Sequence, residues 1–175
     1  SVNFARCVNS INILKEVWRM ADLEGTYAFN RILKYNIPHS KISYPSENNV
    51  ITPKGFSIEI NNLVFENDCI EFILVESDIS NYETTAVDES CLIILMAFYE
   101  PKEKTSNLFA IDHIVFSLPS TNSENEKVIK INTGKRLQLL IESYSKCNFY
   151  FAEVVKIISS KKFLWSSTVC KPVSF

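Results

Sequence analysis

The chain has 175 residues, the size of one ordinary domain, and 46% of them are apolar while 22% are charged. This composition excludes a disordered chain, and the longest apolar run, Cys91–Tyr99, is far too short to cross a bilayer. The net charge of −2 does not select a class of partner. We therefore expect one globular domain over residues 1–175 and no contact with a membrane.

The cysteines indicate the compartment. There are five of them, an odd number, and they lie far apart among mostly apolar neighbours: Cys7, Cys69, Cys91, Cys147 and Cys170. Small secreted domains carry denser sets that pair as disulfides. We expect reduced, buried thiols and an intracellular protein of the cytoplasm or the nucleus. The sequence starts at Ser1 without an initiator Met or a signal-peptide pattern, which favours a segment of a longer protein.

The first elements in chain order are helical. Apolar residues recur every three or four positions from Phe4 to Ala21, which predicts one amphipathic helix. Gly25 marks a break before a second, shorter helix that carries Phe29 and Ile32. Two helices are therefore expected to open the domain.

The stretch between Asn36 and Gly55 contains three prolines among polar residues, so we expect a long loop. Loops of this length inside a compact domain are uncommon and often bind partners. Residues 38–53 are therefore a candidate contact surface, and a connector without a binding role is the alternative. The candidate partner-binding residues of this loop are His39, Lys41 and Tyr44.

The middle of the chain predicts strands. Apolar and polar residues alternate over 56–60 and 70–74, with turn residues between the two runs, which is typical of an antiparallel meander. The continuous apolar run of Cys91–Tyr99 favours a central strand buried on both faces, with a short buried helix as the alternative. Residues 108–118 alternate again and are expected to form a hairpin with that run.

The last third mixes both types of element. Residues 128–131 predict a short strand and residues 135–144 a helix. The pattern over residues 147–158 fits a helix or a strand, and residues 163–169 fit a closing strand. The overall expectation is an α+β fold with two N-terminal helices packed on a mainly antiparallel sheet of five to seven strands and one further helix near 135–146. A small β-barrel or sandwich capped by helices is the alternative.

Motifs for catalysis or cofactor binding do not occur in the sequence. Three glycines cannot build the loops that hold phosphates, and neither a C-x-x-C nor an H-x-x-x-H pair is present for zinc. The two histidines are His39 and His113, and a dyad of Cys91 with His113 has no supporting local pattern. We expect no enzyme activity, no cofactor, no metal and no small-molecule substrate.

Charge is strongly segregated along the chain. Residues 51–100 carry ten acidic residues and one basic residue, whereas residues 127–175 carry nine basic and two acidic residues. In one interpretation the two segments are neighbours in the fold and neutralise each other. In the other interpretation they form separate acidic and basic patches, each of which selects a partner.

The basic segment also contains aromatic rings, the combination that single-strand binders use. The candidate contacts to nucleic acid or to an acidic partner are Lys130, Lys135, Arg136, Lys156, Lys161 and Lys162. Charge segregation, the long loop and the missing chemistry together favour a non-catalytic protein-interaction module of an intracellular multi-subunit assembly. Nucleic-acid binding through the basic segment is the competing hypothesis, and a diverged or inactive enzyme fold is the third.

Overall fold

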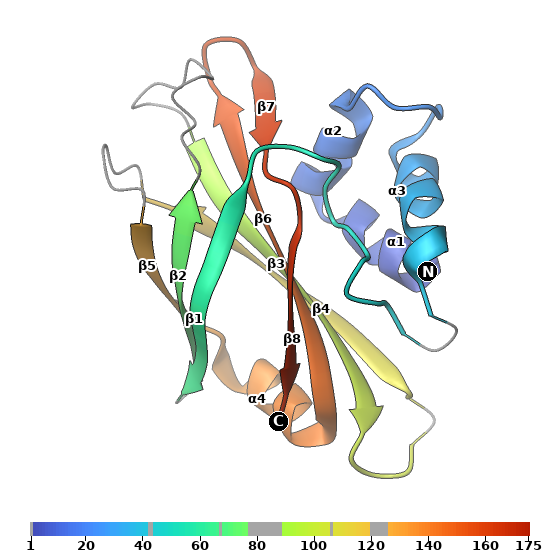
Figure 1. Ribbon diagram of the computed structural model, residues 1–175, viewed down its shortest axis with the longest axis vertical. Helices are drawn as coiled ribbons and strands as arrows, with labels where there is room; N and C mark the ends of the chain where they lie inside the picture. Colours follow the sequence, from blue (N-terminus) through green and yellow to red (C-terminus); the bar gives the residue numbers. More distant parts are fainter. Residues whose placement is uncertain (1, 42–43, 67, 77–88, 106, 120–125) are drawn as a thin grey trace.

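The computed structural model describes residues 2–41, 44–66, 68–76, 89–105, 107–119 and 126–175 (Figure 1). Within these residues the chain forms four α-helices, one 3-10 turn and eight strands. The helices are α1 (Val2–Ser10), α2 (Asn12–Met20), α3 (Ala28–Asn36) and α4 (Gly134–Ser143), and the 3-10 turn is Ile37–His39. The strands are β1 (Ile58–Glu66), β2 (Cys69–Glu76), β3 (Glu89–Pro101), β4 (Phe109–Leu118), β5 (Glu126–Asn132), β6 (Tyr144–Ile157), β7 (Lys162–Trp165) and β8 (Val169–Ser174).

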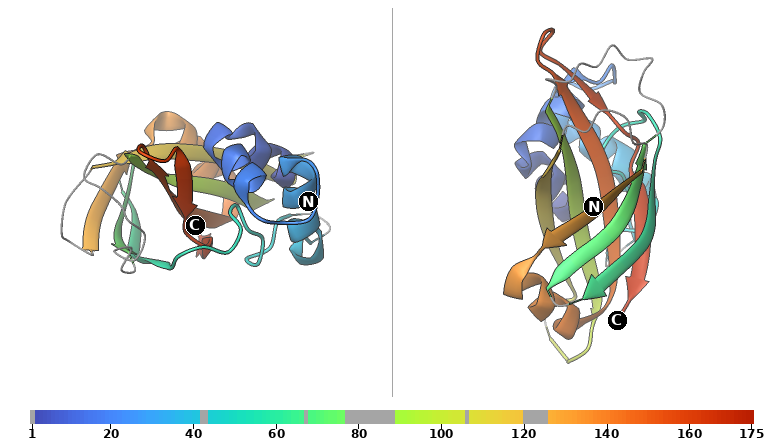
Figure 2. Two further views of the ribbon diagram at one scale, coloured as in Figure 1. Left: turned by 90° about the horizontal axis from the view of Figure 1, so that it is seen from above. Right: turned by 90° about the vertical axis from the view of Figure 1, so that its left-hand side faces the viewer.

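The elements form three layers, with a five-stranded sheet in the middle (Figure 2). Its strand order is β4-β3-β6-β7, and β8 pairs with the other end of β6. The N-terminal helices cover one face, and a three-stranded sheet of order β1-β2-β5 packs against the other. All ladders between these strands are antiparallel. The predicted α+β class is confirmed, and its two packed sheets correspond to the alternative of a sandwich capped by helices rather than to a single sheet.

The two central strands, β3 and β6, bury both of their faces. Ile94 and Phe151 point toward the small sheet, whereas Ile93 and Ala152 point toward the helices. Because successive side chains of a strand alternate between faces, a strand between two cores needs apolar residues at every position. This arrangement explains the apolar run of β3, and it shows that residues 147–157, which fitted either element type, belong to a strand.

The N-terminal periodic run forms two helices, where one was predicted. Ile11 has an extended backbone (φ −83°, ψ 106°) between α1 and α2, and it is buried. The Ser10 hydroxyl donates to the Cys7 carbonyl at 2.7 Å, an alternative to the bonds that would continue the helix. The bend lets both nine-residue helices pack their apolar sides against the same sheet. With α3, three helices rather than two cover this face.

The long segment between α3 and β1 is held by buried amides. Asn36 and Asn49 are 0% and 1% exposed, and the Asn49 amide donates to the Asn36 side-chain oxygen at 2.9 Å. The same oxygen accepts the Val50 N–H at 2.8 Å, and the Tyr150 hydroxyl of β6 donates to the Ser46 carbonyl at 2.7 Å. Polar side chains therefore replace regular secondary structure in fixing this segment.

The two sheets are joined along one side by a short seam. Phe56 forms a parallel bridge with Ser166, in which its N–H donates to the Trp165 carbonyl at 3.1 Å and its carbonyl accepts the Ser167 N–H at 2.8 Å. A Cβ at the neighbouring Gly55 would lie 1.9 Å from the Trp165 carbonyl oxygen, so this close approach requires glycine. The seam joins the sheets on the β1 side of the sandwich, and within the described residues β5 and β4 end the two sheets on the other side.

Candidate functional site

The predicted basic contacts do not form one patch. Lys135 and Arg136 begin α4, whereas Lys161 and Lys162 lie at the turn between β6 and β7, at the opposite end of the molecule (Figure 1). The other two candidates, Lys130 and Lys156, lie on β5 and β6, in different sheets. Arg136 also contacts the Asp112 carboxylate at 2.8 Å. The β6–β7 ladder places Lys156 beside Lys161 and Lys162, so the structure separates these three residues from Lys135 and Arg136.

The acidic and basic segments are neighbours in the fold. Two ion pairs join them, with nitrogen–oxygen distances of 2.6 Å for Lys127–Glu76 and 2.9 Å for Lys146–Glu100. Two further opposite charges are cross-strand partners, namely Glu71 with Lys130 and Glu89 with Lys156. The first interpretation of the charge segregation thus accounts for these residues, because the charges meet within the protein.

The predicted loop residues lie between α3 and β1, and Tyr44 contacts β3. The ring of Tyr44 stacks on Tyr99, with centroids 4.2 Å apart, and the Lys41 ammonium donates to the Tyr44 hydroxyl at 3.3 Å. His39 ends the 3-10 turn with an exposed side chain, and its carbonyl accepts a hydrogen bond from Ser46. Lys41 and Tyr44 therefore lie together beside Tyr99 of β3.

Five strands have only one strand partner within the described residues, and two of them, β4 and β5, lie on the side of the sandwich away from the Phe56–Ser166 bridge. β4 pairs with β3 and β5 pairs with β2, and within the described residues neither strand has a second strand partner. On β4 the side chains of His113, Val115 and Ser117 share one face and are exposed. Val115 is 50% exposed, and Val128 on β5 is 72% exposed. An uncovered strand edge offers unpaired backbone N–H and carbonyl groups to an extended peptide.

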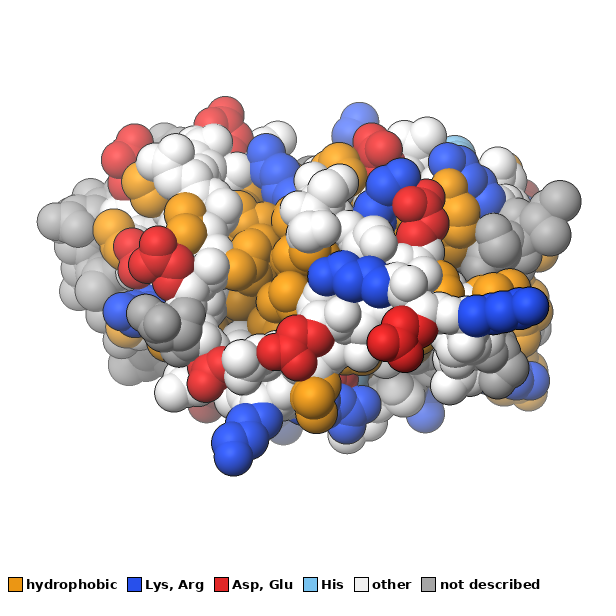
Figure 3. Space-filling model, turned by 90° about the horizontal axis from the view of Figure 1, so that it is seen from below, with side chains coloured by type: hydrophobic (Ala, Val, Ile, Leu, Met, Phe, Trp, Pro, Cys, Tyr) orange, Lys and Arg blue, Asp and Glu red, His pale blue; other side chains and the backbone are white. Residues whose placement is uncertain are grey.

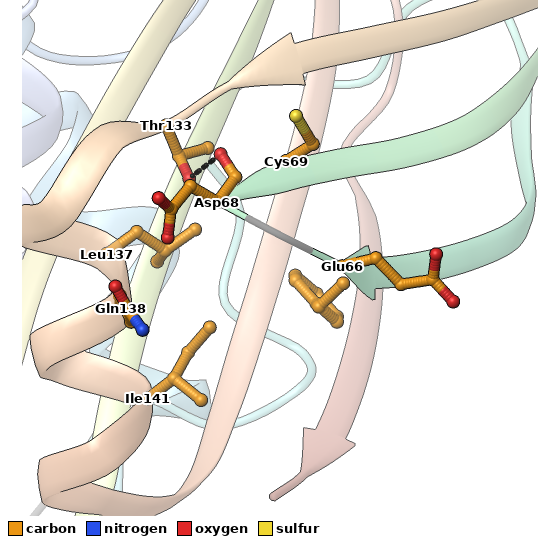
Figure 4. A pocket seen from close by; sticks show the side chains of 8 residues that line it. Glu66, Asp68, Cys69, Thr133, Leu137, Gln138 and Ile141 are labelled. Carbon is orange, nitrogen blue, oxygen red and sulfur yellow. Dashed lines mark hydrogen bonds between the residues drawn. The ribbon is translucent and has the colours of Figure 1, made fainter.

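A hollow lies at the lower end of the sandwich, between α4 and the connection of β1 to β2 (Figure 3). It has a volume of about 260 Å³, and Phe65, Leu137 and Ile141 supply its apolar lining. Thr133 and Asp68 face each other at its rim, where the Thr133 hydroxyl donates to the Asp68 carbonyl at 2.9 Å (Figure 4). The hollow is open and lacks convergent charged groups, so it offers apolar contact rather than chemistry.

Four polar side chains converge at the opposite end of the inter-sheet core. Glu153 on β6 has the inward orientation of Phe151 and Val155 and is 1% exposed. The Ser90 hydroxyl of β3 donates to Glu153 Oε1 at 2.8 Å. From the small sheet, Glu76 and Lys127 form an ion pair in which both side chains are nearly buried, at 10% and 13% exposure. We call Glu76, Ser90, Lys127 and Glu153 the polar cluster.

The polar cluster contains two carboxyl groups and one ammonium group, so its charges do not balance when both carboxyls are ionised. The pKa of Glu153 is raised to about 7, chiefly by burial and then by the Glu76 carboxylate, while the Ser90 hydrogen bond and Lys127 oppose the rise. The second oxygen, Glu153 Oε2, is buried and has no hydrogen-bond partner. A proton between the Glu76 and Glu153 carboxyls would supply the donor that Glu153 Oε2 lacks. It would also balance the charge of a cluster in which one ammonium faces two carboxyls.

Sequence reasoning missed the polar cluster, although one signal was present. Glu153 is the only charged residue in the run Phe149–Val155, and it has the same parity as three apolar residues that face the inter-sheet core. The alternation of side chains along the strand therefore places the Glu153 side chain in the core between the sheets. Its partners come from three other strands, and a single sequence does not show that they meet.

The cysteine and histidine candidates are not arranged for nucleophilic catalysis. On the β3–β4 ladder Cys91 pairs with Ser117, and His113 pairs with Leu95, four positions along. Burial raises the pKa of the Cys91 thiol to about 11, which disfavours the reactive thiolate. Within the part of the chain that the structure describes, no three His, Cys, Asp or Glu side chains are grouped as metal ligands.

The fold and the site together define a class: a helix-covered antiparallel sandwich with a buried polar cluster between its sheets, in which β4 and β5 have no second strand partner within the described residues. Comparison of the chain with protein-family models, curated proteins and solved structures found no match. Among the described residues, no helix is long and apolar enough to cross a membrane.

Proposed function

We propose that this protein is an interaction module that binds an extended segment of a protein partner along the free edge of β4. The observation that carries the proposal is the edge itself. β4 spans ten residues, Phe109–Leu118, and within the described residues its side opposite β3 carries no strand. An added strand gains main-chain hydrogen bonds, and its alternate side chains read the surface beside the edge.

The surface beside this edge supports the same mode of binding. Val115 is half exposed beside His113 and Ser117, so a partner strand would meet one β-branched apolar side chain between two polar ones. The N-terminal helices pack on β3 and β6 and leave these three side chains uncovered. Apolar contact at the centre and polar contact at the rim are typical of protein interfaces.

The experiment is capture of partners on the purified domain with and without nuclease, followed by a variant pair. Val115→Lys places a charge on the edge without removing a buried group, and such charges block strand pairing. Leu139→Lys is the matched control, because Leu139 is 61% exposed and lies on α4 rather than on β4. We expect nuclease-resistant partners that Val115→Lys loses and Leu139→Lys retains.

Hydrogen exchange then locates the bound segment. Backbone amides of Ile111–Ser117 should exchange more slowly in the complex, because the partner strand hydrogen-bonds to the edge. Equal binding by Val115→Lys and the control, or protection confined to other elements, would refute the edge mode. Loss of all partners on nuclease treatment would instead favour nucleic-acid binding.

A further inference from the structure

We propose that Glu153 and Glu76 share one proton as a latch between the two sheets: the bound proton holds this end of the sandwich closed, and its loss opens it. The geometry carries the inference. Glu153 belongs to the large sheet and Glu76 to the small sheet, and both side chains point into the core between them. A proton shared by these carboxyls therefore bridges the layers.

The groups around the pair cannot neutralise it without that proton. Among the described residues, Lys127 of β5 supplies the one positive charge, and it is paired with Glu76 at 2.6 Å. Ser90 donates to one oxygen of Glu153, while the other oxygen is buried without a donor. The Cys91 thiol, on the helix-facing side of β3, adds no positive charge, and the Glu153 carboxylate raises the pKa of this thiol. With both carboxyls ionised, an uncompensated buried charge remains, which costs several kcal/mol.

Topology indicates which part moves. Near this end the Phe56–Ser166 bridge ties the start of β1 to the large sheet. Within the described residues, the end of β2 and the start of β5 have no backbone ladder to the large sheet and contact it through side chains. β5, which carries Lys127, is also the strand farthest from the seam. Opening at this end therefore separates β2 and β5 from β3 and β6 and admits water to Glu153.

The pH dependence of opening follows from the difference in proton affinity between the closed and open states. Glu153 binds its proton more tightly in the closed state, so closure is favoured fully below the ordinary glutamate pKa and is lost as pH rises toward neutrality. The equilibrium constant for opening should rise about tenfold per pH unit between roughly pH 5 and 7 and level off above that range.

Hydrogen exchange of the purified chain, corrected for the intrinsic rate at each pH, tests the latch. Amides in the paired ends of β2 and β5, Leu74–Glu76 and Glu126–Val128, should lose about tenfold protection per unit between pH 5 and 7. Glu153→Gln should abolish this dependence. Glu71→Gln, which alters an exposed carboxylate on the outer face of β2, should leave it unchanged.

A measurement on the unaltered protein keeps the test independent of how Glu153→Gln folds. Infrared pH-difference spectra report the carbonyl band of a protonated carboxyl, and one such band should titrate near neutral pH. Persistence of the protection gradient in Glu153→Gln, or the lack of any carboxyl titrating above about pH 6, overturns the latch. A gradient that vanishes in Glu153→Gln and persists in Glu71→Gln supports it.

Discussion

Replacing Glu153 by Gln should stabilise the protein at neutral and alkaline pH. The Gln amide can donate to Glu76 and its carbonyl can accept from Ser90, so the variant imitates the protonated carboxyl without its proton. The gap between the ordinary glutamate pKa of 4.5 and about 7 corresponds to about 3 kcal/mol of unfolding free energy. Glu153 is 1% exposed, so solvent screening removes little of this value.

The sign of this difference depends on pH. The folded state of the unaltered protein binds the Glu153 proton more tightly than the unfolded state does. Its stability advantage is therefore complete below about pH 4.5 and is lost as pH rises to about 7. The variant lacks this titration, so the two proteins should be equally stable at acidic pH and differ by up to about 3 kcal/mol above pH 7.

Urea denaturation at a series of pH values measures the difference directly, with the fluorescence of the buried Trp18 as the signal. The comparison of two proteins at each pH cancels the titration of the other carboxyls. A variant that is less stable than the unaltered protein at pH 8, or a difference that does not grow between pH 5 and 7, would refute the reasoning.

Two further predictions concern the elements that fix the sandwich. Gly55→Ala should lower the unfolding free energy by about 2–3 kcal/mol or more, because its Cβ would meet backbone at the seam, whereas Gly134→Ala, with φ +65° and open space, should cost about 1 kcal/mol. Equal losses in denaturant titrations would contradict this. Asn36→Ala should cost about 3 kcal/mol, because it orphans buried donors, and exposed Asn61→Ala should cost almost nothing. Similar thermal midpoints for these two variants would count against the buried network.

Local patterns in the sequence predicted most of the element types, although residues 147–158 of β6 fitted either a helix or a strand. Alternation over residues 70–74 and the apolar run of 91–99 correspond to β2 and β3. The break at Ile11 was missed because its side chain continues the helical periodicity and only its backbone departs from it. Eight strands in two sheets, rather than five to seven in one, follow from long-range pairing that local periodicity does not encode.

The candidate site was less predictable for the same physical reason. The polar cluster draws one residue from each of four strands, and Glu76 and Glu153 are far apart in sequence. Charge counts over long segments revealed an imbalance, but only the strand register shows that these charges meet each other. A buried carboxyl is recognisable from sequence by its parity within an apolar strand, and its partners are not.

Ion pairs between the acidic and basic segments reduce the positive charge that is available to an outside partner. Among the described residues, three of the nine bases in the basic segment, Lys127, Arg136 and Lys146, are paired with carboxylates. Phosphate binding gains its affinity from many clustered cations, and Lys135 and Arg136 lie at the opposite end of the molecule from Lys161 and Lys162. The free edge of β4 does not depend on this charge balance. Recognition through main-chain hydrogen bonds is therefore the mode of binding that the fold leaves most open.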